Sequence, residues 1–585
     1  MKKTSSILFA LVISLGLVTT APVSADGTII NVPGDYLTIQ EAIDAASDSD
    51  TIMVAAGLYE ENVVIDKSLT LKGAQAGVDA RTRSGSETII EPDEEETGIS
   101  IITAEGLVVE IDGLTVQNGA HGIATPEPTM AADITVKNVR VLNPSEFGIS
   151  LTFTMETTVE YCYVENADIA INAGALEPFP PTVATFRNNE VVNSDFGITG
   201  YLEDSLIEGN LVRDFADGGI GISGQFLNTQ LKYNTATGYV EGAGLSFEEH
   251  VYRPLSDNVN VEGNTFTENS IGVYVFDTQT ELEGITVNFN NFDDNSWYGV
   301  RNDASETLDA TRNWWGANDG PRHAGPGGSG DFISANVNFE PWLAAALVTL
   351  QTETVTDDTV DAKDEADTEV VVTGTATVTV AQLAGNPGDD GPTDFSALGK
   401  YIDIYVPNTT EVTEIEIRLY YTDAEIATAG ISQEESLRLF WWNGTEWVQC
   451  SDSGVDTDST NGYSGYMWAK IRDDTVPSLV DLQGTPFGGY GHPSEPPTPW
   501  PCFIASAVYG TDRAKEIDVL REFRDAILLP NSLGARFVSL YYQISPPIAG
   551  FISQNEVIRT AVRVGFVDPI VAILNWSHDS WSMRD

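Results

Sequence analysis

The stretch SFEEHVYRP at residues 246–254 places two carboxylates, an imidazole and a guanidinium close together: Glu248, Glu249, His250 and Arg253. A carboxylate beside an imidazole is a pairing that general acid–base catalysis uses. If the protein is an enzyme, these four side chains are its candidate catalytic residues. A surface loop in a very acidic chain often gathers such groups, however, so the stretch alone does not establish catalysis.

Three aspartates could serve a metal ion instead. Asp277, Asp293 and Asp294 lie in two neighbouring segments, VFDTQTELEG and NNFDDNSW. Carboxylate oxygens are the ligands that Ca²⁺ prefers, so these residues are a candidate calcium site, with adventitious binding the most we expect. The five histidines and six methionines are scattered and form no soft-ligand cluster. We therefore expect no resident metal or other cofactor.

Tryptophans gather in two further stretches. RNWWGANDGPRH at 312–323 contains Trp314 and Trp315 beside charged and amide side chains. FWWNGTEWVQC contains three more, Trp441, Trp442 and Trp447. Exposed indole rings stack on sugars, so the second cluster is a candidate glycan platform, although packing in a core or across strands is the interpretation we favour.

The charge of the chain limits its partners. Its 585 residues include 87 acidic and 29 basic side chains, a formal net charge of −58. Such a field repels nucleic acid and other polyanions, so we expect no nucleic-acid partner and no tight binding of polyanionic substrates without bridging cations.

The first 25 residues have the organisation of a secretory signal peptide. Lys2 and Lys3 precede an apolar run, and small residues end at Ala25. We expect a secreted or cell-surface protein whose mature chain starts near Asp26. Its three cysteines do not form a disulfide framework.

These side chains must be positioned by a repeat. Similar units recur every 21 to 30 residues or so, each with a short strand, a turn, a small residue and a second strand. Examples are ITVKNVRVLNPSEFGISL (134–151), TTVEYCYVENADIAINAG (157–174) and VNVEGNTFTENSIGVYVF (259–276).

One position of the repeat carries asparagine in six successive units: Asn189, Asn210, Asn234, Asn264, Asn290 and Asn313. Strands stacked about 4.8 Å apart would place these amides above one another. The sequence therefore predicts a hydrogen-bonded asparagine ladder. Leu114, Val139 and Cys162 hold this position in earlier units, which indicates that Cys162 is a buried apolar residue and not a reactive thiol.

This repeat resembles the right-handed parallel β-helix proteins of the pectin lyase-like superfamily. The resemblance covers residues 26–345 and implies a shaft of roughly eleven coils, about 50 Å long at strand spacing. The superfamily includes pectate lyases, pectin methylesterases and proteins of unknown activity. The Asn-Thr-Asp pattern of its hydrolases and the Gly-x-x-Asp-Phe-x-x-Gly pattern of its methylesterases are absent, which counts against these chemistries.

The repeat also suggests a role for RNWWGANDGPRH. Asn313 ends the asparagine column, and Trp315 takes the position of Phe266 and Phe292 in earlier coils. The stretch resembles the terminal coil of secreted β-helix proteins. We expect Trp314 and Trp315 to cap the open end of the stack, where bare strand edges invite aggregation.

Two further domains are expected after the shaft. Residues 346–369 have no apolar period and are read as an acidic linker. Alternating segments at 370–488 predict an antiparallel β-sandwich, followed by a Gly/Pro linker at 489–501. The expected fold class is thus an all-β right-handed parallel β-helix, an antiparallel β-sandwich and a small α-helical C-terminal domain.

Residues 502–585 are nearly neutral, with eight basic and nine acidic side chains. CFIASAVYG followed by LREFRD closely resembles the CFI-box C-terminal domain, whose signature here is Cys502, Phe503, Ile504, Tyr509 and Gly510. The resemblance suggests sorting or association with the membrane or another envelope component. A small helical domain with a buried Cys502 is an equal alternative.

The sequence as a whole favours a modular, non-catalytic protein of the cell surface. Its β-helix would bind a glycan or a partner, and its C-terminal segment would associate with the envelope. The alternative is a carbohydrate-active enzyme, similar to polysaccharide lyases, hydrolases or esterases, that uses the β-helix face.

Overall fold

The computed structural model describes residues 27–126, 132–174, 180–214, 219–238, 241–247, 255–282, 284–324, 327–388, 391–431, 433–459, 461–493, 503–511, 514–528, 532–553 and 556–581. The chain forms two compact units. The first holds most of the chain through Thr393, together with 397–422 and 438–490, and the second holds 394–396, 423–437 and the residues from Gly491 onward.

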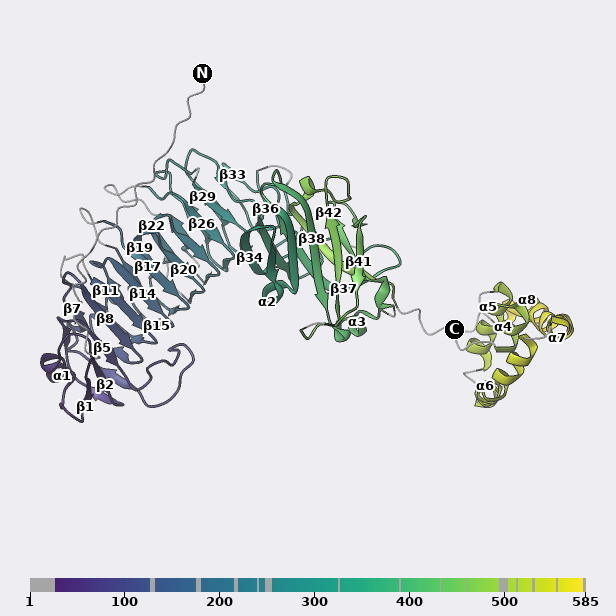
Figure 1. The fold of residues 1–585 in the computed structure, drawn as a ribbon, viewed down its shortest axis with the longest axis horizontal. Helices are drawn as coiled ribbons and strands as arrows, with labels where there is room; N and C mark the ends of the chain where they lie inside the picture. The colour runs from purple at the N-terminus through teal and green to yellow at the C-terminus, as the bar shows by residue number, and fades with distance from the viewer. Residues whose placement is uncertain are drawn as a thin grey trace, which may run out of the picture. The chain divides into compact units, whose positions relative to one another are not determined.

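A right-handed parallel β-helix forms the first part of unit one (Figure 1). The coils build three parallel sheets, which we name A, B and C, and sheet A is extended at its ends by strands that have no counterpart in the other two. Sheet A has thirteen strands: β1 (Ile29–Val32), β2 (Asp50–Val54), β5 (Leu69–Lys72), β8 (Leu107–Asp112), β11 (Ala132–Lys137), β14 (Glu156–Glu160), β17 (Val183–Arg187), β20 (Leu206–Glu208), β23 (Gln230–Lys232), β26 (Val259–Glu262), β29 (Ile285–Asn288), β32 (Leu308–Asp309) and β33 (Val337–Asn338).

Sheets B and C have ten strands each. Sheet B contains β3 (Gly57–Tyr59), β6 (Thr88–Ile90), β9 (Thr115–Gln117), β12 (Arg140–Leu142), β15 (Tyr163–Glu165), β18 (Glu190–Val192), β21 (Leu211–Arg213), β24 (Thr235–Thr237), β27 (Thr265–Thr267) and β30 (Asn291–Asp293). Sheet C contains β4 (Val63–Ile65), β7 (Thr97–Ile101), β10 (His121–Ala124), β13 (Phe147–Leu151), β16 (Ile169–Ala173), β19 (Phe196–Glu203), β22 (Ile220–Leu227), β25 (Ala243–Phe247), β28 (Ile271–Val275) and β31 (Tyr298–Asn302).

Aliphatic side chains from the three sheets fill the interior of the β-helix in one continuous core. The short helix α1 (Ile39–Ala45) precedes β2; Thr38 caps its N-terminus by accepting a hydrogen bond from the Glu41 amide, and Ile39, Ala42 and Ile43 are buried. The corners between sheets use left-handed backbone, for example at Asn138 (φ 52°) and Asn188 (φ 53°). Asparagine tolerates this geometry better than most residues, which explains its frequency at the corners.

The asparagine column lies inside the β-helix and is fully hydrogen-bonded. The Nδ2 of Asn234 donates to Asn264 Oδ1 (2.9 Å) and to the Ile207 carbonyl (2.8 Å). Its Oδ1 accepts from the backbone N–H and Nδ2 of Asn210. The same pattern runs from Asn189 to Asn313. The Cys162 amide donates to the first Oδ1 of the column, and burial raises the pKa of the Cys162 thiol to about 12.

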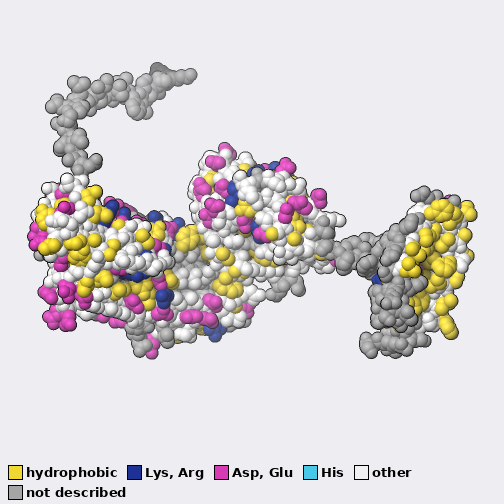
Figure 2. All heavy atoms as spheres, turned by 90° about the horizontal axis from the view of Figure 1, so that it is seen from below, with side chains coloured by type: hydrophobic (Ala, Val, Ile, Leu, Met, Phe, Trp, Pro, Cys, Tyr) yellow, Lys and Arg dark blue, Asp and Glu magenta, His cyan; other side chains and the backbone are white. Residues whose placement is uncertain are grey.

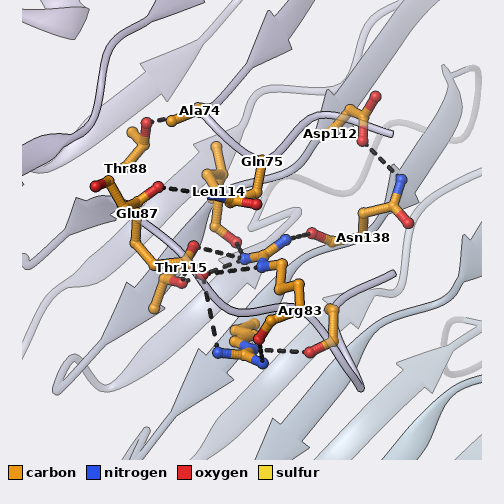
Figure 3. A network of polar contacts seen from close by, with 12 residues as sticks. Ala74, Gln75, Arg83, Glu87, Thr88, Asp112, Leu114, Thr115 and Asn138 are labelled. Carbon is orange, nitrogen blue, oxygen red and sulfur yellow. Dashed lines mark hydrogen bonds and ion pairs between the residues drawn. The ribbon is translucent and has the colours of Figure 1, made fainter. Parts of the chain in front are cut away.

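A long connection between β5 and β6 folds back over the corners of neighbouring coils (Figure 3). The Arg83 guanidinium, whose side chain is completely buried, donates to the Asn138 and Leu114 carbonyls and pairs with Glu87 at 2.9 Å. Arg140 in turn donates to the Ala80 and Arg83 carbonyls of this loop. One buried cation thus fastens the loop to several coils.

An antiparallel sandwich follows in the same unit. Its sheet contains β34 (Leu347–Thr356), β35 (Thr359–Ala362), β36 (Thr368–Leu383), β37 (Ser396–Tyr405), β38 (Val412–Tyr421), β39 (Arg438–Trp442), β40 (Trp447–Gln449), β41 (Ser453–Asp456), β42 (Gly465–Ile471) and β43 (Gln483–Gly491). The short helices α2 (Lys363–Ala366) and η2 (Leu479–Asp481) join strands. The sixteen-residue β36 pairs with β34, β35, β37 and β38.

Residues 346–369 differ from the expected linker, because β34, β35 and α2 lie within them. The threonines of β34 pair with those of β36 through side-chain hydrogen bonds, such as Thr352 with Thr379 at 2.9 Å. The polar sequence therefore reflects a half-exposed strand and not a flexible tether.

The second unit is mostly helical. Its elements are α3 (Asp423–Ala429), η1 (Glu434–Ser436), α4 (Phe503–Tyr509), α5 (Lys515–Phe523), the π-helix η3 (Arg524–Leu528), α6 (Ser532–Ser553), α7 (Glu556–Val562), the π-helix η4 (Arg563–Val567) and α8 (Asp568–Trp581). Helices α4 to α8 enclose an apolar core that includes Val508, Ile517 and Val571. None of the described helices is long and apolar enough to span a membrane.

Candidate functional site

Two columns of side chains run along the outer face of sheet C. The polar column consists of residues in register on successive strands: Ser150, Asn172, Thr199, Ser223, Ser246, Tyr274 and Arg301. The apolar column runs beside it: Phe147, Ile169, Phe196, Ile220, Ala243, Ile271 and Tyr298. Most members of the polar column are uncharged hydroxyl or amide side chains, which suit polyol hydroxyls.

The columns end in an exposed group of aromatic and charged residues, which we call the Arg301 cluster: Tyr274, Phe276, Trp297, Arg301 and Asp303. The Arg301 guanidinium lies 4.6 Å from the centre of the Trp297 ring and 4.9 Å from that of Tyr274. It donates twice to the Asp303 carboxylate, with the Nε–Oδ1 bond at 3.0 Å. The Tyr274 hydroxyl donates to the same carboxylate at 3.0 Å. These contacts hold the rings and polar groups in one fixed arrangement.

These contacts determine the charge states of Asp303 and Tyr274 in the Arg301 cluster. Burial acts to raise the pKa of Asp303, but hydrogen bonds from Arg301 and Tyr274 and the Arg301 charge outweigh it and lower the pKa. Burial and the bond to Asp303 raise the pKa of the Tyr274 phenol. Asp303 is thus a carboxylate and Tyr274 a neutral donor at neutral pH, so the pair Arg301–Asp303 has no net charge.

Sheets A and B present a different kind of outer face. Charged side chains there pair across strands, as in Lys137–Glu110 (3.0 Å), Arg187–Glu208 (2.8 Å) and Arg213–Glu190 (2.8 Å). On sheet C, aromatic rings lie near hydroxyl side chains, and Trp297, directly before β31, is 52% exposed. Among the described faces of the β-helix, sheet C is therefore the best suited to a neutral ligand.

Some hydroxyls of the polar column lack partners. Ser223 Oγ and Ser246 Oγ, and Gln225 Oε1 on the same strand as Ser223, are buried with no hydrogen-bond partner among the residues that the structure describes. A buried polar atom is costly unless it is paired. Because Ser223 and Ser246 are fully buried, a ligand on this face would reach the polar column through its partly exposed members, which are Asn172, Thr199, Tyr274 and Arg301.

The candidate catalytic residues Glu248, Glu249, His250 and Arg253 lie outside the described residues. By chain position they follow Phe247, the last residue of β25 in sheet C. The sequence did not indicate Trp297, Arg301 or Asp303. The signal that could have found them is the pair of aromatic residues Trp297 and Tyr298 before the repeat's glycine, followed by Arg301 and Asp303 at the end of the same unit.

The three aspartates proposed for calcium are not brought together. Asp277 follows β28 of sheet C, whereas Asp293 ends β30 of sheet B. Asp294 occupies the left-handed corner after β30 (φ 56°). No group of three or more potential metal-binding His, Cys, Asp or Glu side chains occurs within the described part of the chain.

The three tryptophans of the sandwich do not share one exposed surface. Trp447 is buried and packs against Tyr401 and Tyr490, and its Nε1 donates to Asn386 Oδ1 at 3.1 Å. Trp441 and Trp442 are half-buried. Cross-strand packing, with Trp442 5.7 Å from Trp447, accounts for the cluster.

Of the two tryptophans in RNWWGANDGPRH, Trp315 lies inside the β-helix and Trp314 is half-buried. The Trp315 ring stacks on Phe292 (4.8 Å between centres), which stacks on Phe266 (5.5 Å). The aromatic column thus continues into the last coil, where Trp314 pairs with Asn291 by a single bridge.

The C-terminal signature lies in and around α4. Cys502 and the Phe503 side chain fall outside what the structure describes. The Ile504 amide donates to the Tyr541 hydroxyl, and the Tyr509 hydroxyl donates to the Asp568 carboxylate at 2.6 Å. Gly510 ends the helix with left-handed backbone (φ 77°). The signature residues therefore join α4 to α6 and α8.

Comparison with known proteins supports the fold. A family model described as the right handed beta helix region matches residues 171–314. No curated protein matches the chain.

The chain is similar to three solved structures at low identity. These are the Dettilon tailspike protein (12% identity, 80% of this chain and 94% of that chain, TM-score 0.33), a tailspike protein of E. coli bacteriophage HK620 in complex with a pentasaccharide (12%, 80%, 87%, 0.30) and DFA-IIIase from Arthrobacter chlorophenolicus A6 (11%, 54%, 86%, 0.26).

Proposed function

We propose that the protein is a secreted or cell-surface, non-catalytic protein whose β-helix binds a neutral glycan on the outer face of sheet C. The observation that carries this proposal is the Arg301 cluster at the end of the polar and apolar columns. Aromatic faces pack on the C–H faces of sugars, and a fixed Arg–Asp pair offers both donors and acceptors to hydroxyl groups.

The preference for a neutral glycan rests on charge. Arg301 is already neutralised by Asp303 at 2.6 Å, and the chain carries a net charge of −58. A polyanionic chain would meet long-range repulsion with no free cation in the cluster to offset it.

The proposal includes three assignments that rest on sequence resemblance. The β-helix is assigned to the pectin lyase-like superfamily, residues 1–25 to a secretory signal, and residues 502–552 to the CFI-box domain.

The proposal is tested by screening the full mature chain on an array of neutral and acidic glycans and then measuring affinity for the best neutral ligand. Trp297→Ala should weaken binding about tenfold or more, because truncating an aromatic anchor costs at least ~1.4 kcal/mol. Trp442→Ala, which removes a half-buried indole of the sandwich, is the matched control. Loss of binding in Trp442→Ala with no change in Trp297→Ala would place the site in the sandwich and contradict the proposal.

A carbohydrate-active enzyme is the second candidate, favoured by one feature. The segment with Glu248, Glu249, His250 and Arg253 directly follows a strand of sheet C, the face proposed to bind glycan. The array ligands should therefore be incubated with the protein and examined for new reducing or unsaturated ends. Turnover that Glu249→Gln or His250→Ala abolishes would overturn the non-catalytic assignment.

A further inference from the structure

The helical second unit encloses an apolar cavity of about 380 Å³. Side chains from α4, α5, α6 and α8 line it, among them Ile504, Leu520, Val538 and Leu574. Pockets that hold small organic ligands fall in the range of about 300–1,000 Å³.

The cavity opens onto an exposed apolar surface. Phe566 and Ile570 line the cavity, yet they are 60% and 36% exposed. Exposed apolar side chains continue along α8 at Ile573 and Trp576. The lining also includes Arg524 and Tyr541. An occupant can extend from the cavity past Phe566 and Ile570 onto this surface.

Helix α6 adds a second apolar stripe. Leu540, Ile544, Ile548 and Phe551 recur at helical spacing and are all at least 43% exposed. Arg536 is the only charged residue in the 22 residues of this helix. Figure 2 shows hydrophobic side chains gathered over one face of this part of the molecule, at the right of the view. Contiguous exposed apolar patches on a soluble domain mark interaction sites.

The charge of this segment points to the kind of partner. Residues 501–585 carry eight basic and nine acidic side chains, a net charge of −1, whereas the whole chain carries −58 and the remainder therefore −57. A segment that contacts a lipid surface must avoid the repulsion that the rest of the chain would meet there. Exposed apolar stripes on helices of a nearly neutral segment suit helices that lie in the plane of the interface.

We propose that the C-terminal helical unit binds the surface of a lipid bilayer, with one lipid acyl chain entering the cavity between Phe566 and Ile570. The stripes on α6 and α8 then lie at the headgroup level, where an exposed indole such as that of Trp576 is favoured. This binding is independent of the glycan face, so either proposal can fail without the other.

The test is flotation of the full mature chain with phosphatidylcholine vesicles. The wild-type protein should float with the vesicles. The double variant Phe566→Asp/Ile570→Asp should lose at least about tenfold in bound fraction, because two charges at the mouth must be desolvated on insertion. Val480→Asp is the matched control, since Val480 is an exposed apolar residue (69%) of the first unit; it should float like the wild type.

A second variant separates entry into the cavity from adsorption on the surface. Ala505 lines the cavity and is buried. Ala505→Leu reduces the cavity volume and leaves the exposed stripes intact, so it should lower the bound fraction while helical circular dichroism and the melting temperature stay unchanged. Flotation equal to the wild type in this variant would exclude the acyl-chain site. If the wild-type protein does not float but forms dimers, and the double variant is monomeric, the apolar surface binds a second copy of the chain and not a bilayer.

Discussion

Asp331 ends a second buried column of polar side chains in the β-helix. The backbone N–H of Asn269 donates to Asn295 Oδ1 (3.2 Å), and Asn295 donates to Asp331 Oδ2 from both its backbone N–H (3.2 Å) and its Nδ2 (2.6 Å). Burial raises the pKa of Asp331 to about 6, the bonds from Asn295 oppose the rise, and Asp293 and Asp294 add to it. The oxygen of a neutral asparagine side chain at position 331 could accept the same two hydrogen bonds from Asn295.

This arrangement predicts a pH-dependent gain in stability for Asp331→Asn. Because the folded pKa lies above the unfolded value of about 3.8, the wild type loses stability as pH rises from about 4 to 6, and the loss is complete above that range. The neutral amide of the variant removes the free-energy cost of ionising the buried carboxyl. This cost is at most about 3 kcal/mol, at 1.36 kcal/mol per unit of pKa shift. Urea unfolding of both proteins at pH 4.5 and pH 8 measures it.

The variant should be more stable than the wild type at both pH values, by up to about 3 kcal/mol at pH 8 and by only about 1 kcal/mol at pH 4.5. Asn166→Gly, at an exposed corner where φ is 61°, is a control that should show no such dependence on pH. An equal change in stability at both pH values would mean that the amide acts through packing alone.

The structural role of a residue could be predicted from the sequence only where the same residue type recurs at one position of the repeat. The column from Asn189 to Asn313 was visible because one residue type recurs at one repeat position. The column that Asp331 ends was missed because its members differ in type and spacing. The Arg301 cluster was missed for a related reason: its contacts depend on which strands are neighbours, and single-residue chemistry drew attention to Glu248–Arg253 instead.

At the scale of elements, the connection between β5 and β6 shows how a loop becomes part of the fold. Ala80 N–H donates to the Tyr161 carbonyl, and Gly77 N–H donates to the Asp112 carboxylate at 2.9 Å. With Arg83 at its centre, the loop bonds to the corners of successive coils (Figure 3). The loop thereby covers corner carbonyls that would otherwise need water.

Arg83→Met should detach this loop. Removing the cation takes from Glu87 its ion-pair partner at 2.9 Å and from the Asn138 and Leu114 carbonyls one donor each. Loss of one member of a buried pair costs about 3–5 kcal/mol. Hydrogen–deuterium exchange should rise across residues 74–87 and at the corner amides beneath them. Arg81→Met is the matched control, because the Arg81–Asp79 pair is part-exposed and such pairs contribute about 0–1 kcal/mol. Equal exchange in both variants would show that Arg83 does not hold the loop.

Elements after the β-helix were harder to predict than those within it. The alternation of the sandwich strands identified the fold, but the acidic residues of 352–369 concealed β34 and β35. Their threonines and charges face solvent while Val355 and Val360 are buried. A strand with one solvent-exposed face and few apolar residues resembles a flexible linker in the sequence, because its pairing with β36 is not visible there.

At the scale of the whole first unit, Arg312 links the last coil of the β-helix to the sandwich. Its guanidinium lies 3.7 Å from the centre of the Tyr405 ring and donates to the Gln483 carbonyl at 3.3 Å. Tyr233 adds a second link by donating to the Leu350 carbonyl at 2.7 Å. The stretch RNWWGANDGPRH is thus a junction between two domains, beyond its role in the last coil.

Arg312 also faces the buried carboxyl of Asp403. Burial raises the pKa of Asp403 to about 7, and the Arg312 charge works against the rise. The raised pKa means that ionising Asp403 costs stability as pH rises from about 4 to 7, and Arg312 offsets part of this cost only once Asp403 is charged. The contribution of Arg312 to stability must therefore be larger above pH 7 than below it.

Arg312→Met tests this coupling. The variant should lose stacking on Tyr405 at every pH, a cost of about 1–2 kcal/mol, and should lose further stability between pH 5 and pH 8 because Asp403 then ionises without a cation nearby. Urea unfolding at the two pH values measures both parts. Arg312→Lys keeps the charge and should restore the pH-dependent part of the stability alone. If Arg312→Met loses the same free energy of unfolding at pH 5 and pH 8, Arg312 acts only by stacking on Tyr405.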